Sequence, residues 1–160
     1  MNTLKIIGAT AFIAWAPTLA MAGTTINVKL ADKADGMDMS KNMGLGMGMK
    51  GDMKMAPMSI VTSNKFAVRG KVTFNVTNLS KTIIHEMLVA PIKDENTVMP
   101  YIDAENRVDE DKALDLGEVS ELDPGKTGSV TLDMKPGKYI LYCNVPGHYA
   151  MGMWTTLEVK

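Results

Sequence analysis

Apolar and polar residues alternate in several short stretches of this chain, and such alternation predicts strands with one buried face. In the clearest case, Val72, Phe74 and Val76 share one face of the stretch 72–78. Turn sequences such as Pro124-Gly125 separate the stretches. The predicted strands cover residues 25–30, 59–68 (one or two strands around Asn64), 72–78, 85–90, 116–119, 129–134, 138–143 and 154–159. About eight short strands predict one all-β domain, a sandwich or a barrel.

Two stretches interrupt the alternation. Residues 36–58 hold many methionines among Gly, Lys and Asp, and their glycines disfavour a helix. We predict that they form a flexible, Met-rich loop after the first strand. Residues 93–115 are acidic and poor in strand-forming residues, and we predict a surface excursion with some helix there.

The N-terminus has the pattern of a cleaved secretory signal peptide. Lys5 precedes an apolar stretch over 6–19, and small residues follow at Ala20 and Ala22. An uncleaved membrane anchor is the alternative, but Pro17 interrupts the stretch, which is short for a span of about 20 residues. We therefore predict a signal peptide over 1–22, a mature domain over 23–160 without a membrane span, and a periplasmic location.

Charge adds little, but the cysteine and histidine content is informative. The formal net charge is −1, and no basic patch suggests a nucleic-acid partner. The chain has one cysteine, Cys143, and two histidines, His85 and His148. An exported protein with a single cysteine cannot form an internal disulfide. The thiol is then an inert core residue, pairs with another chain, or binds a metal.

The segment between the last two predicted strands favours the metal. It places Cys143, His148 and Met153 within one loop, with four residues between consecutive donors. A thiolate, an imidazole and a thioether suit copper better than calcium or magnesium. A blue-copper site needs a second imidazole, and His85 is the remaining histidine. Met151 is the alternative axial residue.

At these residues the sequence resembles the cupredoxin family, which includes plastocyanin, azurin, rusticyanin and auracyanin. The spacing Cys-x4-His-x4-Met, with Pro146-Gly147 before the histidine, is most similar to rusticyanin and auracyanin. The resemblance implies a Greek-key β-sandwich, one type 1-like copper with a one-electron couple, and His85, Cys143, His148 and Met153 as its ligands. Many members have Asn or Ser after the upstream histidine. Here Glu86 stands there and is a possible competing ligand.

The Met-rich loop suggests a more specific role. Thioethers are soft donors that bind Cu(I) without losing a proton, whereas the alternative is an adaptable apolar surface or a plain linker. Candidate additional Cu(I) ligands are Met37, Met39, Met43, Met47, Met49, Met53, Met55 and Met58. Such loops, and the sequence His85-Glu86-Met87, also resemble periplasmic copper-tolerance cupredoxins.

Two functions follow from these features. The first is copper tolerance or copper handling, with copper ions and a copper-transfer or redox protein as partners. The second is a soluble electron shuttle, for which the acidic residues around 103–115 would dock a basic partner. Two histidines are too few for the additional copper centres of an oxidase, so we predict that the chain is not an enzyme.

Overall fold

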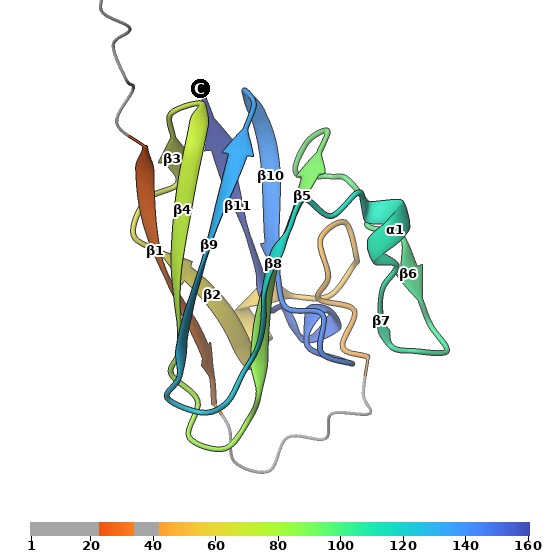
Figure 1. Cartoon of the computed structure of the whole chain (residues 1–160). Coiled ribbons are helices and arrows are strands. Elements are labelled where there is room, and N and C mark those ends of the chain that lie inside the picture. Colours follow the sequence, from red (N-terminus) through yellow and green to blue (C-terminus); the bar gives the residue numbers. More distant parts are fainter. Residues whose placement is uncertain (1–22, 34–41) are drawn as a thin grey trace, which may run out of the picture.

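The computed structural model describes residues 23–33 and 42–160, which form a sandwich of two β-sheets (Figure 1). In the four-stranded sheet, β1 pairs in parallel with β4 and antiparallel with β2. Its order is β2 (Met58–Thr62), β1 (Thr24–Asp32), β4 (Gly70–Asn78), β9 (Thr127–Met134). The order of the five-stranded sheet is β3 (Phe66–Ala67), β11 (Trp154–Val159), β10 (Gly137–Tyr142), β5 (His85–Ile92), β8 (Glu118–Leu122). The predicted all-β sandwich is confirmed.

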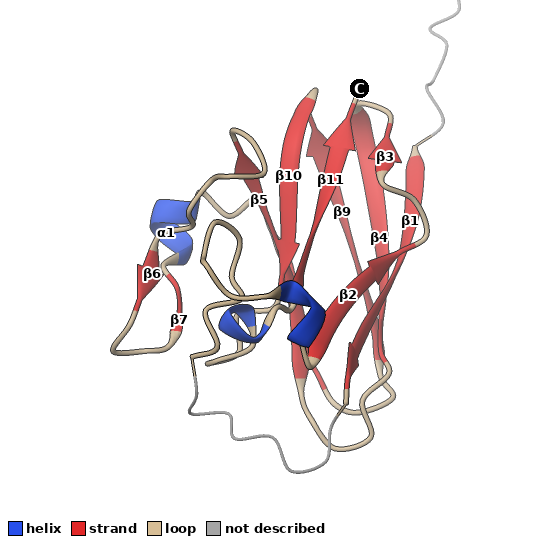
Figure 2. Ribbon diagram, turned by 180° about the vertical axis from the view of Figure 1, so that it is seen from behind, coloured by secondary structure: helices blue, strands red, loops and turns tan. Residues whose placement is uncertain are grey.

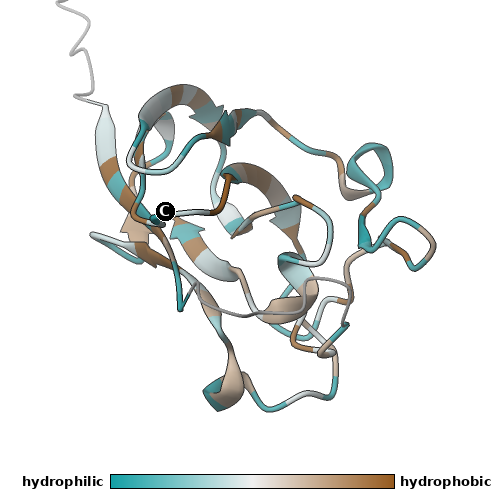
Figure 3. Ribbon diagram, turned by 90° about the horizontal axis from the view of Figure 1, so that it is seen from below, coloured by the Kyte–Doolittle hydropathy of each residue, from teal (hydrophilic) through white to brown (hydrophobic). Residues whose placement is uncertain are grey.

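The main core lies between the two sheets and follows from the alternation. Every second residue of β1 and β4 is buried, and Phe74 at the centre of β4 is fully enclosed. Figure 3 shows the alternation as brown and teal bands along strands. Cys143, Met151 and Met153 belong to this same apolar cluster. The segment with the predicted metal ligands is therefore continuous with the core of the domain.

A second, smaller core covers the outer face of the five-stranded sheet. Leu88 and Ala90 of β5 point into it, together with Ile140 and Tyr142 of β10. Its cover is built from part of the Met-rich segment, the hairpin of β6 (Tyr101–Ile102) and β7 (Arg107–Val108), and the helix α1 (Glu110–Ala113). Because both faces of β5 are covered, its sequence is almost continuously apolar instead of alternating.

The excursion over 93–115 contains some helix, as predicted, and also the hairpin of β6 and β7, which was not predicted. Most strands begin or end one to three residues away from their predicted bounds. β8 begins at Glu118 and not at 116, and β10 ends one residue before Cys143. β5 continues through Pro91 to Ile92. Its pairing with β8 spans only His85–Leu88, so at Pro91 the only neighbouring strand is β10. Pro91 therefore lies at a local edge of the sheet, and a sheet edge tolerates proline.

The described part of the Met-rich segment has little regular structure, as predicted, apart from the 3-10 turn η1 (Met53–Met55). It is nevertheless held against the domain (Figure 2). The amide of Leu45 donates to the carbonyl of Ala150 at 2.9 Å, and its carbonyl accepts from the indole of Trp154 at 2.7 Å. The segment therefore covers the loop that carries the predicted metal ligands, a contact that the sequence pattern did not indicate.

Parts of the sequence-based predictions lie outside the described residues. These are the signal peptide over 1–22 and the thioethers Met37 and Met39. Among the residues that the structure describes, none forms a helix long and apolar enough to cross a membrane.

Candidate metal centre

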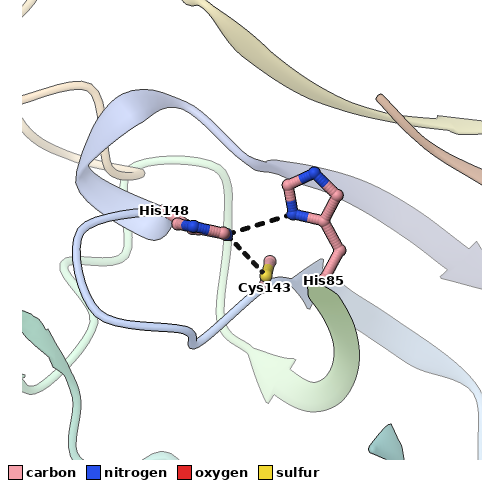
Figure 4. Close-up of side chains that lie close together, drawn as sticks. All are labelled: His85, Cys143 and His148. Carbon is pink, nitrogen blue, oxygen red and sulfur yellow. Dashed lines mark hydrogen bonds between the residues drawn. The ribbon is translucent and has the colours of Figure 1, made fainter. Parts of the chain in front are cut away.

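Two neighbouring strands bring the upstream histidine and the cysteine together. β5 begins at His85, and the antiparallel β10 ends at Tyr142, immediately before Cys143. Both residues therefore lie at the same end of the five-stranded sheet. The loop after Cys143 contains His148 and the 3-10 turn η2 (Tyr149–Met151), and then enters β11. Figure 4 shows the three side chains converging from these elements.

The donor atoms of the three side chains lie within 4.8 Å of one another. Nδ1 of His148 is 3.1 Å from Nδ1 of His85 and 3.2 Å from Sγ of Cys143 (Figure 4). Cys143 and His85 are fully buried, and His148 is 1% exposed. Sequence reasoning placed these three residues at one site, and the structure brings them together.

Backbone hydrogen bonds fix the shape of the loop. The amide of Cys143 donates to the carbonyl of Met153 at 3.0 Å, and the amide of Met153 donates to the carbonyl of His148 at 3.1 Å. A register shift between His85 and Met87 interrupts the pairing of β5 with β8, and the amide of Glu86 lies 3.4 Å from Sγ of Cys143. The sulfur thus has a donor from the upstream strand.

Asn144 attaches this loop to the excursion, and sequence reasoning missed it. Its Oδ1 accepts from the amide of Val108 at 2.7 Å, and its Nδ2 donates to the carbonyl of Val108 at 3.0 Å and to Glu110 at 2.7 Å. The amide of Gly147 donates to the carbonyl of Asn106 at 2.7 Å. The excursion therefore supports the site, and no periodic signal in the sequence marks these long-range contacts.

Burial sets the protonation of the three donors. It raises the pKa of Cys143 to about 12, against hydrogen bonds from backbone amides, that of Glu86 first among them. Burial, and then the neighbouring His85, lower the pKa of His148 to about 3. Burial also lowers the pKa of His85, against the opposite effect of Asp32. Both imidazoles are thus neutral ligands at pH 7, and the thiol loses its proton when a metal binds.

The donor set fits copper. A thiolate with two imidazoles is the trigonal set of a blue-copper centre, in which a weak axial thioether is the usual fourth ligand. Donors bound to one ion at about 2 Å lie within about 4 Å of one another, close to the separations found here. Three polar side chains are enclosed in an apolar core, where such groups need partners, and a shared metal ion satisfies all three.

Comparison with known proteins agrees with this geometry. The model of the family "Copper binding proteins, plastocyanin/azurin family" matches residues 53–160, well over half of the sequence. The chain belongs to this family. The centre is accordingly a type 1 copper site, in which His85, Cys143 and His148 converge and Met153 is the predicted axial ligand. The protein is therefore a cupredoxin, and the cupredoxins are a family of copper proteins and not of enzymes.

Solved structures support the same fold. Rusticyanin from Thiobacillus ferrooxidans is 20% identical with a TM-score of 0.52, and the match covers 87% of this chain and 79% of that one. Auracyanin B is 21% identical with a TM-score of 0.50, covering 89% and 93%. No curated protein sequence matches the chain significantly. At these sequence identities, the two solved structures provide evidence for the fold of this cupredoxin only.

The remaining candidate ligands are placed as follows. Met153 and Met151 are both buried in the main core, so both predicted axial candidates lie in the apolar cluster that contains Cys143. The group of converging donors does not include Glu86. Its carboxylate accepts a hydrogen bond from the backbone of Asn144. Burial first, and then nearby carboxylates, raise the pKa of Glu86 to about 7.

The structure separates the described methionines of the Met-rich segment by their burial. Met47 and Met58 are buried and belong to the two cores, so their thioethers serve packing. Met43, Met53 and Met55 are 39%, 42% and 66% exposed. Met49 is half-buried and packs against the second core. Only part of the segment therefore offers sulfur atoms to the solvent.

Met53 lies next to the metal-binding loop, at Gly152. The backbone of Gly152 is left-handed, with φ of +88°, and a Cβ there would lie 2.7 Å from Cβ of Ala56 and 3.5 Å from Sδ of Met53. We expect Gly152→Ala to lower the free energy of unfolding by about 2–4 kcal/mol, because backbone strain and overpacking add. Urea denaturation of the metal-free protein measures this.

Gly125→Ala is the matched control. Gly125 is also left-handed, with φ of +73°, but a Cβ there would meet nothing within 4 Å. We expect the backbone cost alone, about 1 kcal/mol. Equal losses in the two variants would show that segment 53–56 does not press on the loop.

Proposed function

We propose that this cupredoxin handles copper in the periplasm and contributes to copper tolerance. In this proposal the exposed thioethers Met43, Met53 and Met55 capture Cu(I) weakly, and the buried type 1 centre holds copper more tightly. The observation that carries the proposal is the position of Met53 beside Gly152, where an added Cβ would lie 3.3 Å from Cε of Met53. Gly152 stands between the core methionines Met151 and Met153. An exposed soft donor, Met53, thus lies beside the loop of the copper centre.

The chemistry of the exposed methionines supports this role. An exposed thioether is prone to oxidation and contributes little to a core, so three of them in one segment suggest a metal-binding role. Thioethers favour Cu(I) over harder metals and bind it without proton release. The type 1 centre, when loaded, supplies a one-electron couple between Cu(I) and Cu(II). Its buried donors exclude water, which suits storage of a redox-active ion.

The stoichiometry of Cu(I) binding tests the proposal. We expect the wild type to bind more than one Cu(I), and the triple variant M43L/M53L/M55L to bind fewer. Titration against a Cu(I) chelator measures the count. Substitution is preferable to deletion of the segment, because Met47 belongs to the second core and its removal would damage the fold.

Met47→Leu is the control for this titration. Leucine conserves the volume of the buried side chain, so we expect a small loss of stability and an unchanged Cu(I) count. An unchanged count in the triple variant would refute Cu(I) capture by the three exposed thioethers. It would leave the type 1 centre in place.

A second candidate function is electron transfer to a basic partner. A hollow of about 420 Å³ adjoins Val145 and Pro146 of the loop after Cys143, and most of its charged residues are acidic. These are Glu86, Glu110, Glu118 and Glu121, with Arg107 as the one basic side chain. Such a surface attracts a cationic partner at low ionic strength. Growth of a deletion strain separates the two functions: copper sensitivity supports copper handling, whereas normal copper tolerance with impaired respiration supports the shuttle.

A further inference from the structure

Asp32 is the last residue of β1 and contacts the copper centre from the opposite sheet. Its Oδ2 lies 2.8 Å from Nε2 of His85, and both side chains are fully buried. The ladder between β1 and β2 holds its backbone, because Asp32 stands opposite Met58 and the next amide, of Lys33, donates to the carbonyl of Pro57 at 3.0 Å. The carboxylate is thus part of the fold around the site and not a surface group.

This contact selects the nitrogen with which His85 binds metal. Nε2 faces a carboxylate, which only accepts hydrogen bonds, so Nε2 carries the proton and donates it. Nδ1 is then the atom with the free lone pair, and it is this atom that faces His148 at 3.1 Å. The ring has a ligand side and an anchored side, as in carboxylate–histidine–metal arrangements, where the outer partner orients the ring and increases its basicity.

We propose that Asp32 is a positioning residue of the copper centre, which fixes the ring of His85 and favours Cu(II) over Cu(I). The second effect follows from charge. A buried carboxylate one imidazole away from the metal interacts more favourably with the doubly charged ion, and burial leaves little water to screen it. Asp32 lies more than 50 residues before His85 and beyond the apolar alternation of its strand, so the sequence pattern did not mark it.

Asp32→Asn tests the charge, because the amide oxygen still accepts a hydrogen bond from Nε2. We expect this variant to bind copper and to keep its thiolate-to-copper absorption. The ratio of Cu(I) to Cu(II) affinity should rise at least tenfold, which is about 59 mV in the reduction potential for one electron. Protein-film voltammetry measures the potential, and the visible spectrum reports the state of the centre.

Asp133→Asn is the matched control for the loss of one negative charge. Asp133 is exposed and lies near the end of β9. The other end of β9 pairs with the end of β4 that lies nearest the copper site, so Asp133 is at the end of the strand away from the copper. We expect its potential to equal that of the wild type. An unchanged or lowered potential in Asp32→Asn would overturn the proposal, and so would an equal shift in Asp133→Asn.

A measurement on the wild type covers the case in which Asp32→Asn does not fold. Nitrogen-15 NMR of the metal-free protein should show His85 protonated at Nε2, with a slowly exchanging hydrogen. A spectrum with the proton on Nδ1 and none on Nε2 would overturn the orientation of the ring on which the proposal depends.

Discussion

Replacing Cys143 by serine is expected to abolish the intense visible absorption of the copper-loaded protein. The band of a type 1 centre arises from charge transfer between thiolate and copper, and Cys143 is the sole cysteine of the chain. The hydroxyl is similar in size and can still accept from the amide of Glu86, so the metal-free fold should persist. Absorption spectra after addition of Cu(II) measure the effect.

The same variant should lose most of its stabilisation by copper. A ligand at 100 times its dissociation constant stabilises the folded state by about 2.7 kcal/mol, and this increment requires an intact site. Thermal unfolding with and without Cu(II) compares the two proteins, and the metal-free midpoints serve as the control. A charge-transfer band that survives in Cys143→Ser would remove Cys143 from the centre.

The alternation of apolar residues was sufficient to predict the sandwich because several of its strands bury one face and expose the other. β1, β4 and β11 each bury one face, so period-two patterns mark them clearly. β5 was identified as a strand, but its covered outer face was not, because a continuous apolar stretch does not reveal what packs on it. The ordered contacts of the Met-rich segment were missed for a related reason. The hydrogen bonds that join Leu45 with Ala150 and with Trp154 link residues about 100 positions apart and leave no periodic trace.

The copper site could be predicted further than its surroundings. The donors are chemically distinctive and scarce, so one cysteine and two histidines specified the set almost without ambiguity. The supporting residues are common ones. Asp32 and Asn144 are recognisable only once the chain is folded, because their roles depend on contacts with His85 and Val108. The exposed and buried methionines also look alike in sequence, and only packing separates them.

Two buried thioethers are candidates for the axial position of the copper centre, and paired substitutions distinguish them. Met153 and Met151 are both enclosed in the main core, at 0% and 2% exposure. Leucine nearly conserves the volume of methionine, so each metal-free variant should lose less than about 1.5 kcal/mol of stability. Any larger difference between the copper-loaded variants then reports on the metal and not on packing.

We expect Met153→Leu to raise the reduction potential and Met151→Leu to leave it unchanged. The axial ligand tunes the potential of a type 1 centre. An additional ligand stabilises the more highly charged Cu(II), so replacing it with an apolar leucine favours Cu(I). A tenfold change in the affinity ratio corresponds to about 59 mV, well within reach of voltammetry. The backbone favours Met153, because its carbonyl accepts from the amide of Cys143 and its own amide donates to His148, so its position is tied to two ligands. The opposite result, a shift in Met151→Leu alone, would transfer the axial role to Met151.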